Sequence, residues 1–357
     1  MKNKIAIASA FLAAASFSTA EIVVNEFLSF EGFVDSSYST NQSDIEGVKE
    51  SDNSFGIDQV EISWLFNFDA VTAQIDIEYE GSQRETVVES DNFDEQTGRG
   101  DNDSVIVEQA FVNYALGNGD VITAGRYASM LGFEAYEPTG LYQYSTAYSI
   151  LGEEVSAASQ YVQGVKYTRS TDTTFFGISL QDQAFGNDDD RLGGDTDRDL
   201  GQDSSFAVEV AGSIDLGNGF TVFAGGAFED ADSGDNQILN AYVTYETGAW
   251  LFAAELNLEE NESEFAADLD INSGLLMANY AYSDVASVTA RISMIEAELK
   301  GVDLDITKYT VAHNYAFSDN LLLVTEVSLD DGELDIEGFT DEDGDNLTLA
   351  VELLFSF

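Results

Sequence analysis

The chain has 357 residues but contains no cysteine, one proline and one histidine. Without cysteine, the chain can form no disulfide, no thiolate metal site and no lipid anchor on an N-terminal cysteine. Proline cannot donate to the hydrogen-bond ladder of a sheet, so its near-absence is typical of a chain that consists mainly of strands. A single histidine also leaves no histidine pair for zinc.

Basic residues are scarce as well. Lys and Arg number 13 against 67 Asp and Glu, which gives a formal net charge of −54. Such a surface repels nucleic acid and anionic lipid headgroups and attracts cations. We therefore expect no nucleic-acid partner. The acidity itself fits either a preference for cations or a saline habitat.

Long hydrophobic runs are missing beyond the N-terminus, so the sequence predicts no transmembrane helix. Residues 1–20 carry Lys2 and Lys4, an apolar run and a small-x-small site that ends at Ala20. The run is too short to span a membrane, and we expect a secretory signal peptide rather than an anchor helix. The mature chain is then a single domain, 21–357. Loss of the two lysines leaves 11 basic residues and a net charge of −56.

The C-terminal segment, 346–357, alternates between apolar and polar side chains. Its apolar positions are Leu347, Leu349, Val351, Leu353, Phe355 and Phe357. A period of two indicates a strand with one apolar and one polar face. A final aromatic residue suits a strand that closes a barrel in a bilayer, because aromatic rings sit well at the membrane interface. We expect Phe355 and Phe357 to form the assembly signal of such a barrel.

Other segments alternate in the same way, among them 60–68, 71–79, 206–216 and 250–258. Charged residues on the second face are hard to bury in a β-sandwich, but they cost little when they face a water-filled lumen. A lumen lined by carboxylates should favour cations over anions. The carboxylates predicted to line it are Glu31, Asp35, Glu61, Asp76, Glu78, Glu80, Glu209, Glu255, Glu326 and Glu352.

The connections between strands alternate in length. Tight turns are predicted at Asp69, 117–119, 170–172, 217–219, 247–248, 283–284 and 318–320. Longer polar segments are predicted near 40–54, 81–104, 129–158, 184–203, 230–236, 260–271, 299–304 and 331–345. Short periplasmic turns and long extracellular loops are typical of outer-membrane barrels. The fold class that follows is all-β, a transmembrane antiparallel up-and-down β-barrel of about 16 strands with acidic extracellular loops.

The segment 129–158 differs from a solvated loop because it is rich in aromatic residues and glycine and holds Pro138. We expect it to fold inward against the barrel wall and narrow the pore, the alternative being an ordinary extracellular loop. Basic residues of the flanking and later strands share the lumen parity: Arg126, Lys166, Arg291 and Lys308. The segment's own acids are Glu134, Glu137, Glu153 and Glu154. Opposed charges would set up a transverse field across a constriction or would hold the loop in place as ion pairs.

Two acidic segments have carboxylates at alternate positions, as calcium loops do: Asp195, Asp197 and Asp199, and the segment 341–346. Neither has the full spacing of a calcium-binding loop, so a solvated loop tip is the alternative to a weak Ca²⁺ site. No other cofactor is indicated. The sequence also predicts no catalytic residues, because His313 falls on the lipid-facing side near a turn.

The overall layout, from signal peptide through tight-turn hairpins to a terminal Phe, resembles the general outer-membrane porins. The runs 107–114, 125–127 and 132–134 are similar to the OmpL-like family of β-barrel porins. The resemblance implies a diffusion channel with a constriction loop that assembles as a homotrimer. The scarcity of basic residues on the predicted wall departs from the usual porin pattern.

These observations predict a porin of the bacterial outer membrane that is not an enzyme. It would be a passive, cation-preferring channel for small hydrophilic solutes. Its partners would be outer-membrane lipid, the barrel assembly machinery, the solutes and cations themselves, and two further copies of the chain. The alternatives are a structural or adhesive barrel with a plugged lumen, a barrel enzyme that depends on His313, and a secreted β-sandwich.

Overall fold

A computed structural model provides the fold of the chain. It describes residues 21–45, 47–80, 104–150, 153–154, 156, 158–185, 205–231, 234–262, 268–336 and 342–357. The predicted signal peptide, 1–20, and the candidate calcium ligands Asp195, Asp197 and Asp199 lie outside these residues.

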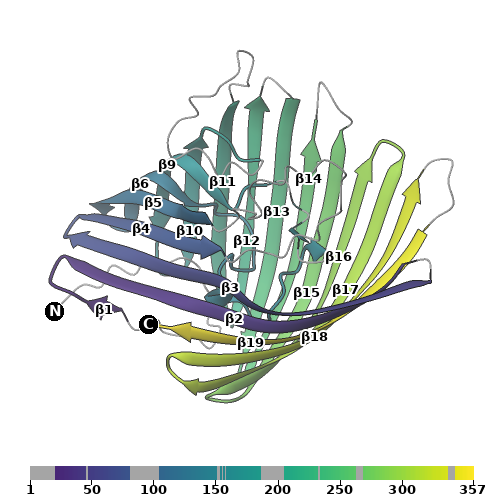
Figure 1. The fold of residues 1–357 in the computed structure, drawn as a ribbon. Coiled ribbons are helices and arrows are strands. Elements are labelled where there is room, and N and C mark those ends of the chain that lie inside the picture. Colours follow the sequence, from purple (N-terminus) through teal and green to yellow (C-terminus); the bar gives the residue numbers. More distant parts are fainter. Residues whose placement is uncertain are drawn as a thin grey trace, which may run out of the picture.

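Sixteen long antiparallel strands form a closed barrel (Figure 1). They are β2 Leu28–Ile45, β3 Val48–Phe68, β4 Val71–Glu80, β5 Ser104–Gly117, β6 Asp120–Ala128, β9 Tyr161–Ser170, β10 Thr174–Gln181, β11 Ser205–Gly217, β12 Phe220–Ala231, β13 Gly234–Thr247, β14 Trp250–Asn261, β15 Leu269–Ser283, β16 Ala286–Leu299, β17 Val302–Ser318, β18 Leu321–Ile336 and β19 Glu342–Ser356. The last strand pairs with β2, from Gly344 opposite Ile45 to Ser356 opposite Phe33. This pairing closes the barrel and confirms both the predicted fold class and the predicted closing strand.

The remaining elements are small. Strand β1, Ile22–Val23, pairs with the start of β2. A two-stranded sheet of β7, Ser149–Ile150, and β8, Glu153–Glu154, follows the short 3-10 helix η1, Pro138–Gly140. No helix within the described ranges is long and apolar enough to span a membrane.

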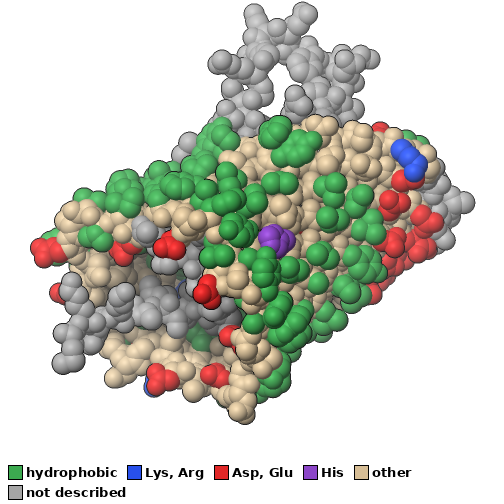
Figure 2. All heavy atoms as spheres, turned by 90° about the horizontal axis from the view of Figure 1, so that it is seen from below, with side chains coloured by type: hydrophobic (Ala, Val, Ile, Leu, Met, Phe, Trp, Pro, Cys, Tyr) green, Lys and Arg blue, Asp and Glu red, His purple; other side chains and the backbone are tan. Residues whose placement is uncertain are grey.

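Side chains alternate between the two faces of the wall. On β19, Leu349, Val351, Leu353 and Phe355 are exposed on the outside, while Glu352 is buried on the inside. The same alternation continues around the barrel, because successive side chains of a strand point to opposite faces. Figure 2 shows the outer apolar side chains on one side of the barrel, with acidic side chains gathered toward one end. The outside therefore suits lipid contact and the inside is largely polar.

All seven predicted tight turns connect neighbouring strands. At 117–119 and 217–219, Asn118 and Asn218 adopt φ near +57° and +55°, and the glycines that follow them adopt φ of +85°. Positive φ at both central residues is the type I′ geometry that matches the twist of a hairpin, and Asn-Gly is its preferred sequence. A Cβ on Gly119 would lie 1.9 Å from the Ser170 carbonyl oxygen, so glycine is required there. We call this end of the barrel the turn end and the opposite end the loop end.

Several segments predicted as loops are strands. Polar residues in 40–54 continue as β2 and β3 up to Gly47, and only two residues separate β12 from β13 or β16 from β17. Lys49 forms an ion pair of 2.9 Å with Asp44 across the first hairpin, and the rings of Tyr38 and Phe55 pack 4.6 Å apart between centroids. Composition alone predicted a loop because solvated strands and loops contain the same polar residues.

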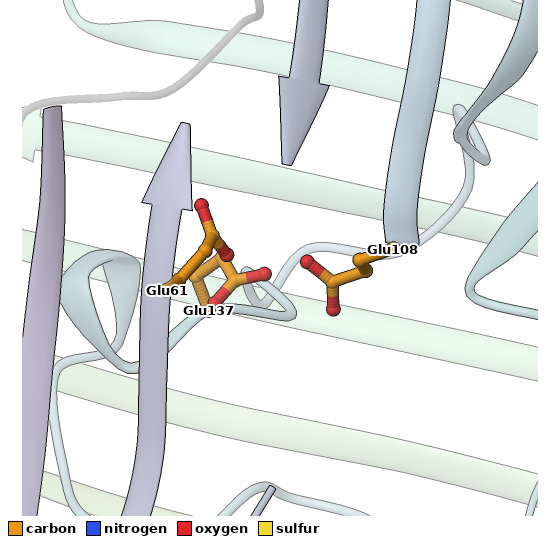
Figure 3. A group of neighbouring side chains, drawn as sticks. All are labelled: Glu61, Glu108 and Glu137. Carbon is orange, nitrogen blue, oxygen red and sulfur yellow. The ribbon is translucent and has the colours of Figure 1, made fainter. Parts of the chain in front are cut away.

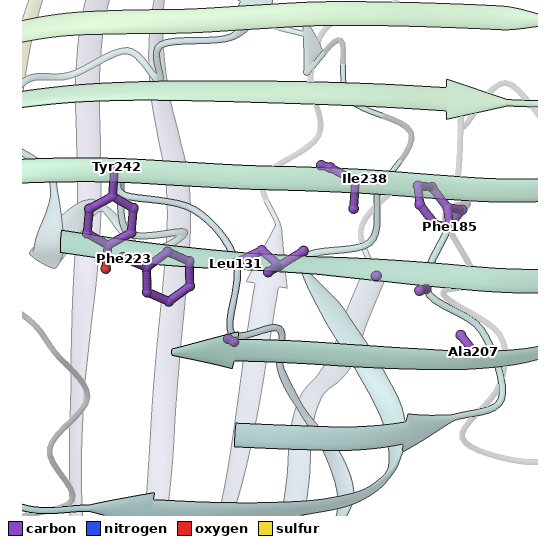
Figure 4. Packing of buried hydrophobic residues seen from close by; sticks show 9 residues of the cluster. Leu131, Phe185, Ala207, Phe223, Ile238 and Tyr242 are labelled. Atoms are coloured by element: carbon purple, nitrogen blue, oxygen red, sulfur yellow. The ribbon is translucent and has the colours of Figure 1, made fainter. Parts of the chain in front are cut away.

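Apolar clusters fill part of the barrel interior. One joins Leu131 and Phe185 to residues of β11, β12 and β13, among them Ala207, Phe223 and Ile238 (Figure 4). A second packs Tyr142 and Ala147 against β14 and β15, and a third has Tyr144 against Phe33 and residues of β17, β18 and β19. Leu131, Tyr142, Tyr144 and Ala147 all belong to the segment between β6 and β9. This segment therefore touches the inner wall from β11 to β15 and again at β17, β18, β19 and β2.

Candidate functional site

The candidate site is the barrel interior where the segment 129–158 contacts the wall. We call this stretch the inward segment. Residues 151, 152, 155 and 157 of it lie outside the described part of the chain. It leaves the wall at the end of β6 and returns at β9, two strands that pair directly with each other from Asp120–Arg169 to Ala128–Tyr161. The wall is thus continuous behind the segment.

Wall carboxylates accept hydrogen bonds from the backbone of the inward segment. Glu209 on β11 accepts from the Met130 amide at 2.7 Å, and Glu255 on β14 accepts from the Phe133 amide at 2.7 Å. Glu326 on β18 accepts from the amides of Tyr144 and Ser145 at 2.8 and 3.1 Å. Hydrogen bonds to charged acceptors are about twice as strong as neutral ones. Three strands therefore hold the segment by its main chain.

Two of the predicted basic residues hold the same segment from strands that lie between β14 and β18. Arg291 on β16 forms an ion pair of 2.7 Å with Glu134 and donates to the carbonyl oxygens of Ser145 and Thr146 at 2.9 Å each. Lys308 on β17 donates to the carbonyl oxygens of Thr146 and Ser149 at 3.2 and 3.3 Å. Both side chains are buried. These contacts tie the inward segment to the wall.

The other two predicted basic residues lie near the start of the segment. Lys166 on β9 donates to the Ala128 carbonyl oxygen at 3.2 Å and sits 4.3 Å above the Tyr127 ring. Arg126 on β6 donates from Nε to the Glu108 carbonyl oxygen at 2.9 Å. These contacts are to the wall and to the base of the segment.

Carboxylates meet where the middle of the segment approaches β3 and β5. Glu137 lies beside Glu61 of β3 and Glu108 of β5, and one carboxylate oxygen from each lies within 4.8 Å of the others (Figure 3). Glu137 accepts hydrogen bonds from the Tyr161 hydroxyl at 2.7 Å and from Gln59 at 3.0 Å. Burial raises the pKa of the Glu137 carboxyl, and the bond from Tyr161 opposes this shift.

A bulge places Glu108 on the inner face. Gln109 is opposite Asp76 and Val107 is opposite Ile77, so Glu108 is the extra residue between them. Bulges re-aim side chains because the added residue breaks the period of two. Glu108 is buried, and its neighbour Gln109 also contacts an inner residue, donating to Asp76 at 2.7 Å.

The remaining predicted lumen acids lie on β2, β4 and β19. Asp35, Asp76, Glu78 and Glu352 are buried on the inner face, and Glu31 is half-buried there. Glu80 belongs to β4 and the pair Glu153 and Glu154 forms β8, but their side chains lie outside what the structure describes. The inner wall is therefore carboxylate-rich, yet most of the described carboxylates are buried.

His313 and the terminal aromatic residues lie where the sequence placed them. His313 Nε2 is 2.6 Å from the Tyr282 hydroxyl, close to the turn end. Phe355 is exposed on the outer face, and the Phe357 ring lies 6.4 Å from that of Phe30 between centroids. Phe357 also exchanges two backbone hydrogen bonds of 2.9 Å with Gly32.

Sequence reasoning missed several wall residues that accept hydrogen bonds from the segments inside the barrel. Glu229 accepts from the amides of Ala184 and Phe185, Glu259 accepts from Ser156, and Asn240 accepts from the Gly132 amide. Each lies at an inward position of its strand, so strand parity could have found all three. Parity could not have found Glu108, because the bulge shifts its register.

The family of the chain follows from a comparison of its sequence with family models. The model described as "Putative beta-barrel porin-2, OmpL-like" matches residues 28–357, which include all sixteen strands of the barrel. The chain belongs to this porin family. It is therefore an outer-membrane protein of the channel-forming class. A comparison with curated proteins gave no match.

Solved structures share the fold of this porin at low sequence identity. OmpT of Vibrio cholerae is 13% identical, with 94% of this chain and 100% of that chain covered and a TM-score of 0.58. An anion-selective porin from Comamonas acidovorans is 13% identical, with 92% and 99% covered and a TM-score of 0.59. The outer-membrane channel DcaP of Acinetobacter baumannii is 12% identical, with 92% and 97% covered and a TM-score of 0.62. At these identities the likeness concerns the fold alone.

Proposed function

We propose that this porin is a passive channel for small hydrophilic solutes, narrowed by the inward segment and selective for cations. The observation that carries the proposal is the anchoring of residues 130–145 to Glu209, Glu255 and Glu326. These carboxylates belong to β11, β14 and β18, so the segment is tied across a large part of the inner wall. A loop tied in this way narrows a pore while the wall behind it stays intact.

The cation preference follows from the excess of inward carboxylates. Among the described residues, nine carboxylates occupy predicted lumen positions of the inner wall, against four predicted basic side chains. A pore lined by acids raises the local concentration of cations and repels anions. Arg291 and Lys308 donate hydrogen bonds to the inward segment. Their positive charges are therefore less available to attract passing anions.

Conductance in planar bilayers tests the proposal. The purified protein should give ohmic steps in KCl, and closures in groups of three would support the trimer that the family resemblance implies. A folded, inserted barrel that passes no current would contradict the channel and support the structural barrel with a plugged lumen. The apolar clusters around Leu131, Tyr142 and Tyr144 are the observation that favours this second candidate.

A further inference from the structure

The acidic residues of the inward segment meet a positive charge at one part of the wall and negative charges at another. Toward β16 and β17 its Glu134 faces Arg291, an ion pair of 2.7 Å. Three residues later, Glu137 faces two more carboxylates, Glu61 and Glu108. Like charges so close together repel, and burial strengthens the repulsion because it removes the screening by water. This contact between segment and wall needs a positive partner.

The carboxylates retain oxygen atoms for such a partner. Glu61 and Glu108 are 7% and 6% exposed, and Oε2 of each has no hydrogen-bond partner. Glu61 Oε1 accepts from Ser63 Oγ at 2.7 Å, which fixes the side chain with its second oxygen toward the cluster. Figure 3 shows Glu61 and Glu137 close together with the Glu108 carboxylate turned toward them. Buried polar atoms without partners are rare in folded proteins and call for an explanation.

The local backbone accounts for the positions of Glu108 and Glu137. The bulge in β5 turns Glu108 inward beside Gln109, although simple alternation would place only one of the two on that face. Pro138 follows Glu137 and begins η1, where the Glu137 side chain makes no capping hydrogen bond. Glu137 has the extended backbone that is usual before proline, and its carboxylate is held at the wall by Tyr161 and Gln59.

We propose that Glu61, Glu108 and Glu137 bind a divalent cation, Ca²⁺, which joins the inward segment to strands β3 and β5. Oxygen donors alone select a hard cation. Ca²⁺, with bonds of about 2.3–2.6 Å, tolerates a wide spread of ligand positions, whereas Mg²⁺ demands about 2.0–2.1 Å in a near-ideal octahedron. Three carboxylates that come from two strands and a loop suit the more permissive ion, Ca²⁺. This inference goes beyond the proposed function and does not depend on it. It also concerns residues other than the acidic loops in which the sequence predicted Ca²⁺.

The neighbourhood supplies further groups that matter for the site. Asp76 and Glu78 lie on the adjoining strand β4 and add negative charge, and the Tyr161 hydroxyl donates to Glu137. Arg126 of β6 donates to the Glu108 carbonyl oxygen at 2.9 Å and brings a positive charge to the same part of the wall. The alternative to a metal ion is a set of protons shared among the carboxyl groups.

Calorimetric titration of the full-length, detergent-solubilised protein with CaCl₂ tests the site, with Mg²⁺ present to suppress weak binding to the acidic surface. We expect one Ca²⁺ site in the wild type. Each of Glu61→Gln, Glu108→Gln and Glu137→Gln should weaken it roughly tenfold or more, because affinity follows the number of charged ligands. The matched control is Glu298→Gln, which removes an exposed carboxylate of β16 and should leave binding unchanged.

Glutamine is close in shape to a protonated glutamate, so these variants should fold, and heat-modifiable gel migration checks that they do. A wild type that binds no more Ca²⁺ than the triple Gln variant would overturn the proposal and leave shared protons as the explanation. An equal loss in Glu298→Gln would overturn it too, because binding would then be a general surface effect. The measurement requires no current, so a barrel that conducts without binding Ca²⁺ and one that binds Ca²⁺ without conducting are distinguishable.

Discussion

At the scale of single residues, the contact between Arg291 and Glu134 decides how firmly the inward segment is held. The Arg291 side chain is fully buried and that of Glu134 is 10% exposed. Arg291 also donates to the main chain at Ser145 and Thr146, so one guanidinium fixes two parts of the segment. Loss of one partner of a buried pair leaves the other charge without compensation.

We predict that Arg291→Met loosens the inward segment by about 3–5 kcal/mol, the usual cost of breaking a buried ion pair from one side. Single-channel conductance should rise, and proteases should cut the segment sooner. Lys300→Met serves as control, since it removes a basic residue at the exposed tip between β16 and β17. The double variant Arg291→Met/Glu134→Gln should regain part of the loss. A single variant that behaves as wild type would show that the pair does not hold the segment.

The terminal residue provides a second prediction at this scale. Phe357 completes the pairing of β19 with β2 through two hydrogen bonds to Gly32, and its ring packs near Phe30 and Phe355. We predict that deletion of Phe357 blocks insertion into the outer membrane, while synthesis and export continue. Cell fractionation checks this, with Phe317→Ala, another exposed aromatic near the turn end, as control. Normal insertion of the truncated chain would contradict an assembly role for Phe357.

At the scale of elements, the inward segment should respond to pH through Glu137. Burial raises the pKa of this carboxyl above its ordinary value of 4.5, and Glu61, Glu78 and Glu108 face it. The docked segment therefore keeps a proton that the free segment loses. Its docking is strongest below pH 4.5 and weakens as the pH rises through the raised pKa.

Without divalent cations, we thus predict that proteolysis of the inward segment speeds up as the pH rises. Ca²⁺ should remove this dependence by replacing the proton, and Glu137→Gln should show a smaller pH dependence than the wild type. Limited proteolysis with EDTA or CaCl₂ across the pH range measures both effects. Docking that becomes tighter with rising pH in EDTA would contradict the assignment.

Much of the barrel was predictable because strand periodicity is a local property. The alternation in 346–357 and the Asn-Gly turns at 118 and 218 identify strands and hairpins without reference to the rest of the chain. Where the strands end at the loop end of the barrel was less predictable, since the polar residues of 40–54 are equally common in solvated strands and in loops. The site was predictable only in part. Parity indicates that Glu326 faces inward but not that it meets Tyr144, 182 positions earlier in the chain.

At the scale of the whole molecule, an apolar outer band, a closed wall and an acidic interior fit a channel of the outer membrane. The chain carries a formal charge of −54, and its described inner acids outnumber the basic side chains there. Its structural neighbour from Comamonas acidovorans is described as anion-selective, so the shared fold does not fix the sign of selectivity. That sign must come from the side chains inside this barrel.

The reversal potential of the wild-type channel in a KCl gradient tests the central claim most directly. A channel lined by carboxylates should pass K⁺ more readily than Cl⁻, and the reversal potential should shift toward the K⁺ equilibrium potential. Glu31→Gln should reduce the shift, since Glu31 is a half-buried carboxylate on the inner face. A reversal potential on the Cl⁻ side for the wild type would contradict both the cation preference and the acidic pore lining on which it rests.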